Sequence, residues 1–156
     1  MTSKEAANRP SGPEAATCAE EEAFLDLLRT ADALSRGPAR VLKREGLSAT
    51  QYNVLRILRG AGEAIPCGEL ANRMITRDPD ITRLLDRLEK RGLIARSRQT
   101  RDRRTVLAWI TPNGLKLLAR LDQPVREAHR RQLGHLGGRR LQTLTNLLRV
   151  ARQQAA

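Results

Sequence analysis

Aromatic residues are scarce in this sequence, which has one phenylalanine, one tyrosine and one tryptophan among its 156 residues. Leucine supplies most of the apolar volume instead, with 24 residues, and leucine is among the better helix formers. Hydrophobic residues make up 40% of the chain, which is enough for one core. At roughly 100–200 residues per domain, the length suits a single domain or a domain with an arm. We therefore expect one mainly helical core.

Long apolar runs are also missing. The longest, Val106–Ile110, is far shorter than the roughly 20 residues of a transmembrane helix, and the N-terminus has no apolar segment typical of a signal peptide. We therefore expect a cytoplasmic protein with no membrane association. There Cys18 and Cys67, the two cysteines, are expected to be reduced. Each is either an ordinary small residue or, where its thiol is activated and accessible, an oxidation sensor.

The residue patterns of common enzymes are not found either. The sequence has no glycine-rich phosphate loop, no nucleophile elbow and no paired carboxylates suited to a cleft. His129 and His135 have no cluster of acidic residues around them at metal-ligand spacing, so we interpret them as solvated or interfacial histidines. We expect no enzymatic activity, no cofactor and no metal ion.

Basic residues outnumber acidic ones, 29 to 17, and the net charge is +12. Residues 77–104 carry a net +5 and residues 112–156 a net +7, whereas residues 1–24 carry a net −3. Arginine accounts for 25 of the basic residues, which fits phosphate and guanine recognition, although a GC-rich genome would also favour arginine. The excess of positive charge indicates a polyanionic partner, with nucleic acid preferred over a membrane surface.

Local signals divide the chain into helices. Ser48 and Gln51 form a capping-box pattern, Asp78-Pro79 predicts a helix start, and Gly92 predicts that helix's end. After Gly92 the apolar period changes to that of a two-stranded β-hairpin with a charged tip. The predicted elements are a disordered arm (1–19), a helix from about residue 20 that Gly37-Pro38 kinks or breaks, helices over about 48–60, 66–75 and 78–91, strands 93–98 and 105–110, a helix from Pro112 to about Ala128, and a last amphipathic helix after Gly138.

Three short helices followed by a hairpin predict a winged helix-turn-helix, in which the third helix enters the major groove of DNA. Its outer face carries Asp80, Thr82, Arg83 and Arg87, which we predict to contact DNA. We interpret Asp78 as a helix cap, whereas Asp80 accepts from a cytosine amino group or rejects other sequences. The charged residues at the tip of the hairpin are also predicted to form part of the DNA-binding site, and the basic ones are placed to enter the minor groove or bind phosphate. These tip residues are Arg101, Asp102, Arg103 and Arg104.

Three segments together resemble the MarR family of bacterial transcription regulators. Leu84-Leu85-Asp86-Arg87-Leu88-Glu89-Lys90-Arg91-Gly92-Leu93-Ile94 is similar to the family's passage from recognition helix to wing. Asp102-Arg103-Arg104 followed by Ile110-Thr111-Pro112-Asn113-Gly114 resembles its wing and the entry to its next helix. Leu47-Ser48-Ala49-Thr50-Gln51-Tyr52 resembles its Leu-Thr-x-x-Gln-aromatic motif. The similarity covers roughly residues 20–152, in order and with family-like spacing.

The resemblance implies a homodimer that binds a pseudo-palindromic operator, usually to repress transcription. It implies a DNA-binding domain over residues 47–111, with dimerisation helices over 20–46 and 112–156. It also implies that the wing Asp102 braces Arg104 or Arg103, and that a small anionic or aromatic molecule, or cysteine oxidation, releases the operator.

Apolar stripes at both ends of the chain agree with a dimer. Phe24, Leu27 and Leu28 form one stripe, and Leu141, Leu144 and Leu148 form another; the alternative is that both cover a monomeric core. A second hypothesis for function is a basic architectural protein that binds DNA or RNA without strong sequence specificity. A large affinity ratio between operator and random DNA would separate the two.

Overall fold

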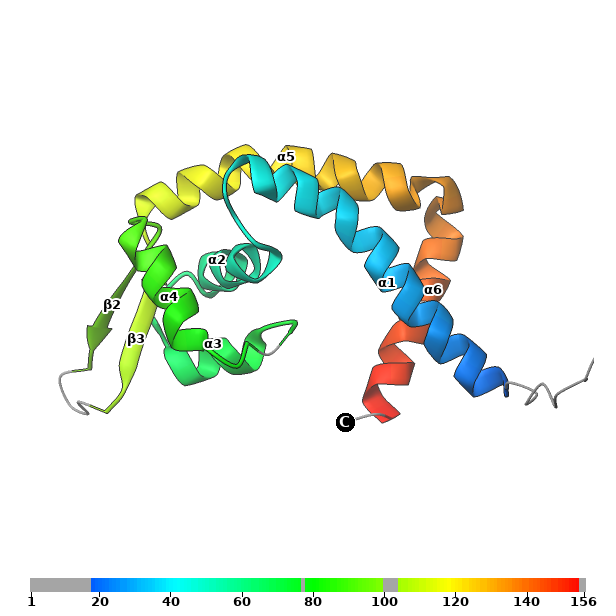
Figure 1. Cartoon of the computed structure of the whole chain (residues 1–156), viewed down its shortest axis with the longest axis horizontal. Helices are drawn as coiled ribbons and strands as arrows, with labels where there is room; N and C mark the ends of the chain where they lie inside the picture. The colour runs from blue at the N-terminus through cyan, green and yellow to red at the C-terminus, as the bar shows by residue number, and fades with distance from the viewer. Residues whose placement is uncertain (1–17, 77, 100–103, 155–156) are drawn as a thin grey trace, which may run out of the picture. The chain divides into compact units, whose positions relative to one another are not determined.

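The computed structural model describes residues 18–76, 78–99 and 104–154, and Figure 1 shows its helices and strands. Nearly all of the expected disordered arm, residues 1–17, lies outside the described residues. The chain forms two structural units, residues 1–33 and residues 34–156, which are described separately below. Among the described residues, no helix is long and apolar enough to cross a membrane.

The first unit consists of the beginning of helix α1 (Ala19–Arg44). Three acidic residues in its first turn favour helix formation because they oppose the positive end of the helix dipole. The exposed fractions of Phe24 and Leu28 are 58% and 54%. Leu27 is also exposed, at 43%, so all three large apolar side chains of the predicted stripe face solvent in this unit.

The second unit begins with the rest of α1, which is not broken at the predicted Gly37-Pro38 interruption. Pro38 lies inside the helix, and Leu42, one turn further on, is fully buried. Proline removes one backbone hydrogen bond, and burial of Leu42 in the core offsets that loss.

Helix α2 (Ala49–Ala61) begins and ends as the sequence predicts. The Ser48 hydroxyl accepts from the Gln51 backbone N–H at 3.1 Å, and the Gln51 side chain accepts from the Ser48 N–H at 3.0 Å. The capping box is therefore confirmed.

Helix α3 (Cys67–Arg73) and helix α4 (Ile81–Lys90) complete the helix-turn-helix. The predicted start of α4 at Asp78-Pro79 is wrong, because Asp80 is the N-cap and its carboxylate accepts from the Arg83 backbone N–H at 3.1 Å. Asp78 instead accepts from the Asp80 N–H at 2.8 Å, which forms a turn before the helix.

The sheet has three antiparallel strands in the order β1-β3-β2, so the predicted two-stranded hairpin is confirmed and a third strand, β1, was not predicted. Strand β1 (Ile65–Pro66) pairs with β3 (Val106–Ile110), and β2 (Ile94–Arg98) pairs with the other edge of β3. Strands β2 and β3 form the hairpin that Figure 1 shows beside α4. The fold is therefore mainly helical with a small sheet, as expected for a winged helix-turn-helix.

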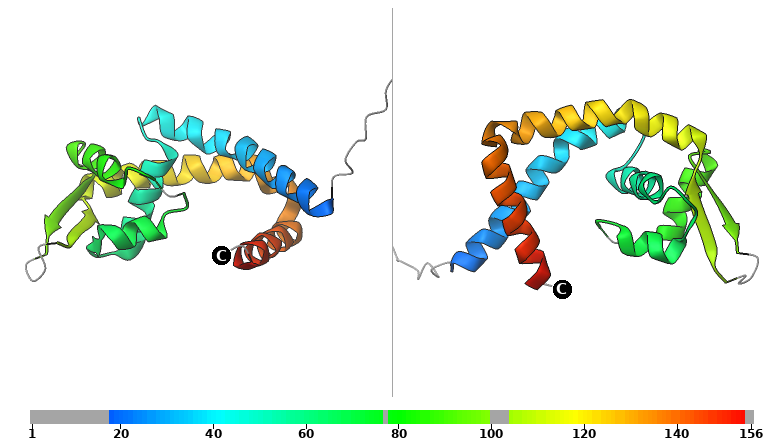
Figure 2. Two further views of the ribbon diagram at one scale, coloured as in Figure 1. Left: turned by 60° about the horizontal axis from the view of Figure 1, so that its bottom comes forward. Right: turned by 180° about the vertical axis from the view of Figure 1, so that it is seen from behind.

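Helix α5 (Pro112–Leu133) starts at the Thr111 cap and continues through Pro124. It leads through the 3₁₀ helix η1 (Gly134–Leu136) into α6 (Gly137–Gln154), and Figure 2 shows the turn between them. Helix α6 has no buried residue, although it is 18 residues long.

The core of the second unit joins the three short helices, the sheet and α5. Leucines fill it, as the shortage of aromatic residues predicts, because each helix turns an apolar face inward. Its fully buried large side chains are Leu42, Val54, Leu55, Leu58, Leu70, Leu85, Leu88, Ile94 and Leu118.

Candidate nucleic-acid interface

Helix α4 separates an apolar face from a basic face. Leu84, Leu85 and Leu88 are buried, and their spacing of one and four residues places them on one side of the helix. Most of the polar residues on the other side are exposed, and Arg87 and Lys90 lie there three residues apart. Burial of the leucines therefore fixes which side of α4 is available to a partner.

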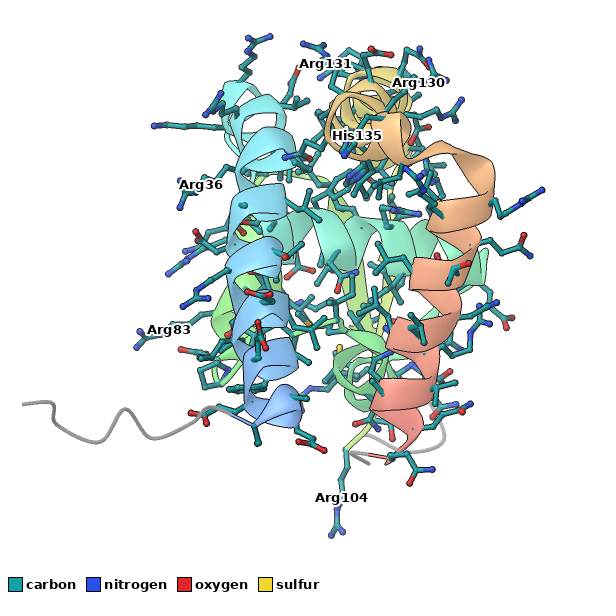
Figure 3. The ribbon with its side chains drawn as sticks, turned by 90° about the vertical axis from the view of Figure 1, so that its right-hand side faces the viewer. Arg36, Arg83, Arg104, Arg130, Arg131 and His135 are labelled. Atoms are coloured by element: carbon teal, nitrogen blue, oxygen red, sulfur yellow. The ribbon has the colours of Figure 1, made fainter. Side chains whose placement is uncertain are left out.

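Arg83 extends outward from the first turn of α4, as Figure 3 shows. Its side chain is 76% exposed, and its Nε lies 3.1 Å from the Asp80 carboxylate. Asp80 therefore both caps the helix and orients Arg83, while Thr82 beside it is also exposed. All four predicted contact residues on this element, Asp80, Thr82, Arg83 and Arg87, lie on its exposed surface.

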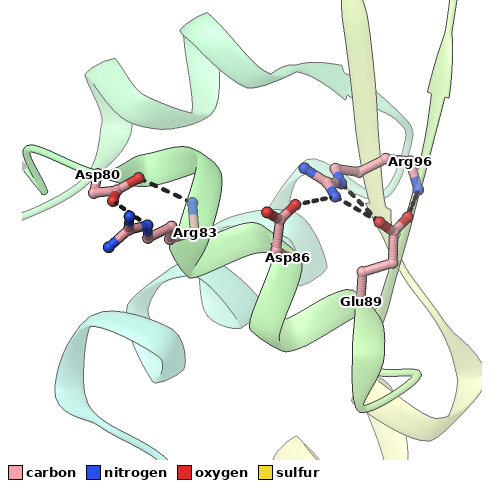
Figure 4. Close-up of polar contacts among 5 residues, drawn as sticks. All are labelled: Asp80, Arg83, Asp86, Glu89 and Arg96. Carbon is pink, nitrogen blue, oxygen red and sulfur yellow. Dashed lines mark hydrogen bonds and ion pairs between the residues drawn. The ribbon is translucent and has the colours of Figure 1, made fainter.

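A second polar group links the end of α4 to β2 (Figure 4). Arg96 of β2 donates through Nη2 to Asp86 at 2.5 Å and to Glu89 at 2.6 Å. Its Nε donates to Glu89 at 3.0 Å, and its backbone N–H donates to the other Glu89 oxygen at 3.0 Å. The side-chain hydrogen bonds that Arg96 donates to Glu89 and then to Asp86 raise the pKa of Arg96 above its ordinary value, so its single positive charge is shared between two carboxylates.

The basic hairpin ends near Arg104, which is exposed and points away from the helices in Figure 3. The Gln99 N–H donates to the Thr105 carbonyl at 2.9 Å, so the strands stay paired close to the tip. Arg101, Asp102 and Arg103 lie outside the described residues, and so does the predicted brace by Asp102.

Some basic residues of this segment serve the fold instead. Arg91 donates to the carbonyl oxygens of Gly46 and Glu45, both at 2.8 Å, and so fastens the end of α4 to the loop before α2. Thr111 donates to the Gly92 carbonyl at 2.6 Å and ties the same region to the start of α5. These contacts anchor α4 at its C-terminal end.

The sequence interpretation gave no role to Arg96 or to its partners Asp86 and Glu89. A signal was present in the strand period, because Arg96 is two residues after the buried Ile94 and so lies on the same face of β2. An inward-facing arginine needs carboxylate partners, and Asp86 and Glu89 are three residues apart on one side of α4. The exposed Arg98 was also missed as a wing residue.

Known proteins that resemble this chain include the following three, and a family model described as the MarR family matches residues 47–106. A crystallised MarR transcription factor from Planctomyces limnophilus is 42% identical, with 85% of this chain and 97% of that chain covered and a TM-score of 0.67. The homoprotocatechuate degradative operon repressor of Escherichia coli is 30% identical over 108 residues, which are 69% of this chain and 72% of the repressor.

The third is a cysteine-to-serine mutant of MarR from Escherichia coli, solved in complex with operator DNA. It is 25% identical, with 83% of this chain and 95% of that chain covered and a TM-score of 0.76. The exposed basic helix and paired wing of this chain thus occur in a fold whose known members regulate transcription. The chain belongs to the MarR family of DNA-binding transcription regulators.

Proposed function

We propose that the chain is a homodimeric, sequence-specific repressor that binds a pseudo-palindromic operator. The observation that carries this proposal is the exposed stripe of Arg83, Arg87 and Lys90 on α4, beside a basic hairpin. A helix of this kind reads only a few base pairs in the major groove, so two copies about one DNA turn apart are needed for a specific site. The similarity to the homoprotocatechuate degradative operon repressor supports repression rather than activation of transcription.

Apolar side chains that the described structure leaves exposed support dimerisation. Phe24, Leu27 and Leu28 face solvent in the first unit. In the second, α6 exposes Leu147 and Val150, whose exposed fractions are 63% and 57%. The predicted α6 stripe of Leu141, Leu144 and Leu148 is partly exposed. A second copy of the chain is the partner that we propose for these faces, because large exposed apolar patches mark interaction sites.

A positive cluster between α2 and α5 supports release by a small anionic or aromatic molecule. Arg59 donates to Asp122 with two nitrogens, at 2.8 and 2.9 Å, and Arg126 and Arg56 add positive potential there. The Arg56 guanidinium also lies 5.9 Å from the ring centroid of Tyr52. One carboxylate among three arginines leaves an attractive potential for an anion, and Tyr52 offers an aromatic face.

Release by oxidation has less support from the described thiols. Burial raises the pKa of the Cys67 thiol, which disfavours the reactive thiolate. Cys18 is exposed and is the better candidate of the two.

Selection of bound sequences from a random DNA pool tests the proposal. A two-fold symmetric consensus, bound at least 10³-fold more tightly than random DNA at fixed salt, is expected. Arg83→Ala should weaken binding to that consensus by about 1–3 kcal/mol and relax its specificity. Equal affinity for all sequences, with a steep salt dependence, would instead identify an architectural nucleic-acid-binding protein.

Sedimentation of the full chain tests the dimer. We expect a dimer in the micromolar range and a shift to monomer on Phe24→Glu combined with Leu28→Glu, because both substitutions place charge in the proposed interface. Ile75→Glu is the matched control, since Ile75 is exposed but lies in the loop between α3 and α4. An unchanged dimer in the double variant would contradict the assignment of this surface.

A further inference from the structure

Arg96 is a basic residue of the DNA-binding segment whose charge does not face the solvent. Its side chain is 19% exposed, whereas that of Arg83 on α4 is 76% exposed. Its guanidinium makes three hydrogen bonds to two carboxylates. Donors already engaged in this way are poorly placed to bind a DNA phosphate, so Arg96 needs a different explanation from its neighbours.

The contacts of Arg96 join two elements that a winged helix must present together. Asp86 and Glu89 belong to α4, and Arg96 belongs to β2, whose continuation reaches the wing tip. The Glu89 carboxylate receives both the backbone N–H and the guanidinium of Arg96. Both the main chain and the side chain of the strand are therefore fixed to the helix.

A small rotation at this junction has a large effect at the tip. Arg96 is paired with Ala108 in the sheet, and Arg104 lies four residues before Ala108, which is about 14 Å along a strand. A rotation of about 10° at the junction would therefore displace Arg104 by roughly 2 Å, enough to break a hydrogen bond to DNA.

We propose that Arg96 is a positioning residue, which fixes the wing relative to the recognition helix through Asp86 and Glu89 so that both elements meet the same DNA duplex. The proposal rests on the proposed function, because it requires a specific operator. It assigns Asp86 and Glu89 to the same junction, so neither carboxylate is available to a base.

Glu89→Gln gives the sharpest test because two explanations predict opposite signs. The substitution removes a negative charge from a DNA-binding surface, so electrostatics alone predict tighter binding. Loss of positioning predicts the reverse, and we expect at least fivefold weaker binding to the selected operator. Arg96→Met should have a similar effect, and the double variant should bind no more weakly than Arg96→Met alone.

Glu63→Gln is the matched control, since it removes a carboxylate that is exposed and has no ion pair among the described residues. It should leave operator affinity unchanged or slightly raised. Circular dichroism and thermal melting establish that each variant is folded. If Glu89→Gln does not fold, Asp86→Ala replaces it, because that change removes a single hydrogen bond of the junction.

The salt dependence of binding separates positioning from stability. Each lost phosphate contact reduces the slope of log K against log salt by about 0.9. Loss of wing contacts should therefore lower the slope of folded Glu89→Gln, whereas a residue that only stabilises the fold would leave it unchanged. Wild-type or tighter affinity with an unchanged slope would overturn the proposal. If the wild type itself prefers no sequence, the proposed function fails instead.

Discussion

The Gly114→Ala variant should be less stable than the wild type, although alanine is the better helix former. Gly114 lies in the first turn of α5, and its N–H donates to the Thr111 hydroxyl at 3.2 Å. A methyl group added there would collide with the backbone carbonyl of Leu93 and would lie 2.6 Å from Cγ1 of Ile110. The first obstacle is main chain, so it cannot be relieved by a change of rotamer.

The expected magnitude follows from two opposed effects. Replacing glycine by alanine in a helix gains up to about 1 kcal/mol, whereas overpacking a tight site costs about 1–3 kcal/mol and occasionally more. Since the contact is with backbone, we take the upper end of that range and expect a net loss of about 2 kcal/mol. For a chain of this size that corresponds to a fall in Tm of about 4–8 °C.

Urea unfolding at fixed protein concentration measures the difference, with Gly60→Ala as the matched control. Gly60 also lies in a helix, α2, but nothing lies within 4 Å of the added methyl group. That variant should be more stable than the wild type by up to about 1 kcal/mol. If Gly114→Ala were as stable as Gly60→Ala, the close approach of α5 to Leu93 and Ile110 would be refuted.

Three further expectations concern stability and charge. Ser48→Ala should lower the free energy of unfolding in urea by about 1 kcal/mol, because the capping hydroxyl is lost; an unchanged value would count against the capping box. The hydrogen bonds from Arg59 hold the pKa of Asp122 below its ordinary value of 3.8, so this carboxylate stabilises the fold above that pH and ceases to do so as the pH falls through the lower folded-state pKa. When the pH is lowered from 7 to 2, the free energy of unfolding of Asp122→Asn should therefore fall less than that of the wild type. The difference between the two losses should be under about 1 kcal/mol, because the ion pair is partly exposed. Parallel pH profiles for the two proteins would contradict this. Arg130→Ala combined with Arg131→Ala should change operator affinity by less than about twofold in a fluorescence-anisotropy titration. The reason is that Arg130 lies about 27 Å along the axis of α5 from its first residue, Pro112, which follows the wing strand β3. A tenfold loss of affinity would show that this end of α5 contacts DNA.

The fold was predictable from sequence wherever its determinants are local. The capping box at Ser48 and the Thr111-Pro112 helix start depend on residues three positions apart or closer, and both appear as expected. Asp78 and Asp80, on either side of Pro79, offered two possible caps, and Asp80 is the cap because the Asp78 carboxylate instead forms the turn before the helix. A pattern of residue types does not distinguish these alternatives.

The missed features depend on contacts between distant segments. Strand β1 consists of Ile65 and Pro66, which are too few to show a period, and it exists because β3 offers a free edge. The role of Arg96 depends on β2 lying against α4, which brings residues seven and ten positions apart together across a turn. Sequence reasoning identified the exposed arginines of α4 correctly as surface residues because the buried leucines determine that face.

The number of basic residues in a DNA-binding segment is larger than the number that can contact DNA. Residues 77–104 contain ten basic residues, but Arg91 holds two carbonyl oxygens and Arg96 holds two carboxylates. At most eight of the ten can therefore replace counterions on phosphate in each subunit. The same contacts engage Asp86 and Glu89, so two basic and two acidic residues are occupied together and the net charge of the remaining residues of the segment is still +5. Arginine in this segment thus has two functions, recognition where it is exposed and orientation of the recognition elements where it is enclosed by carboxylates.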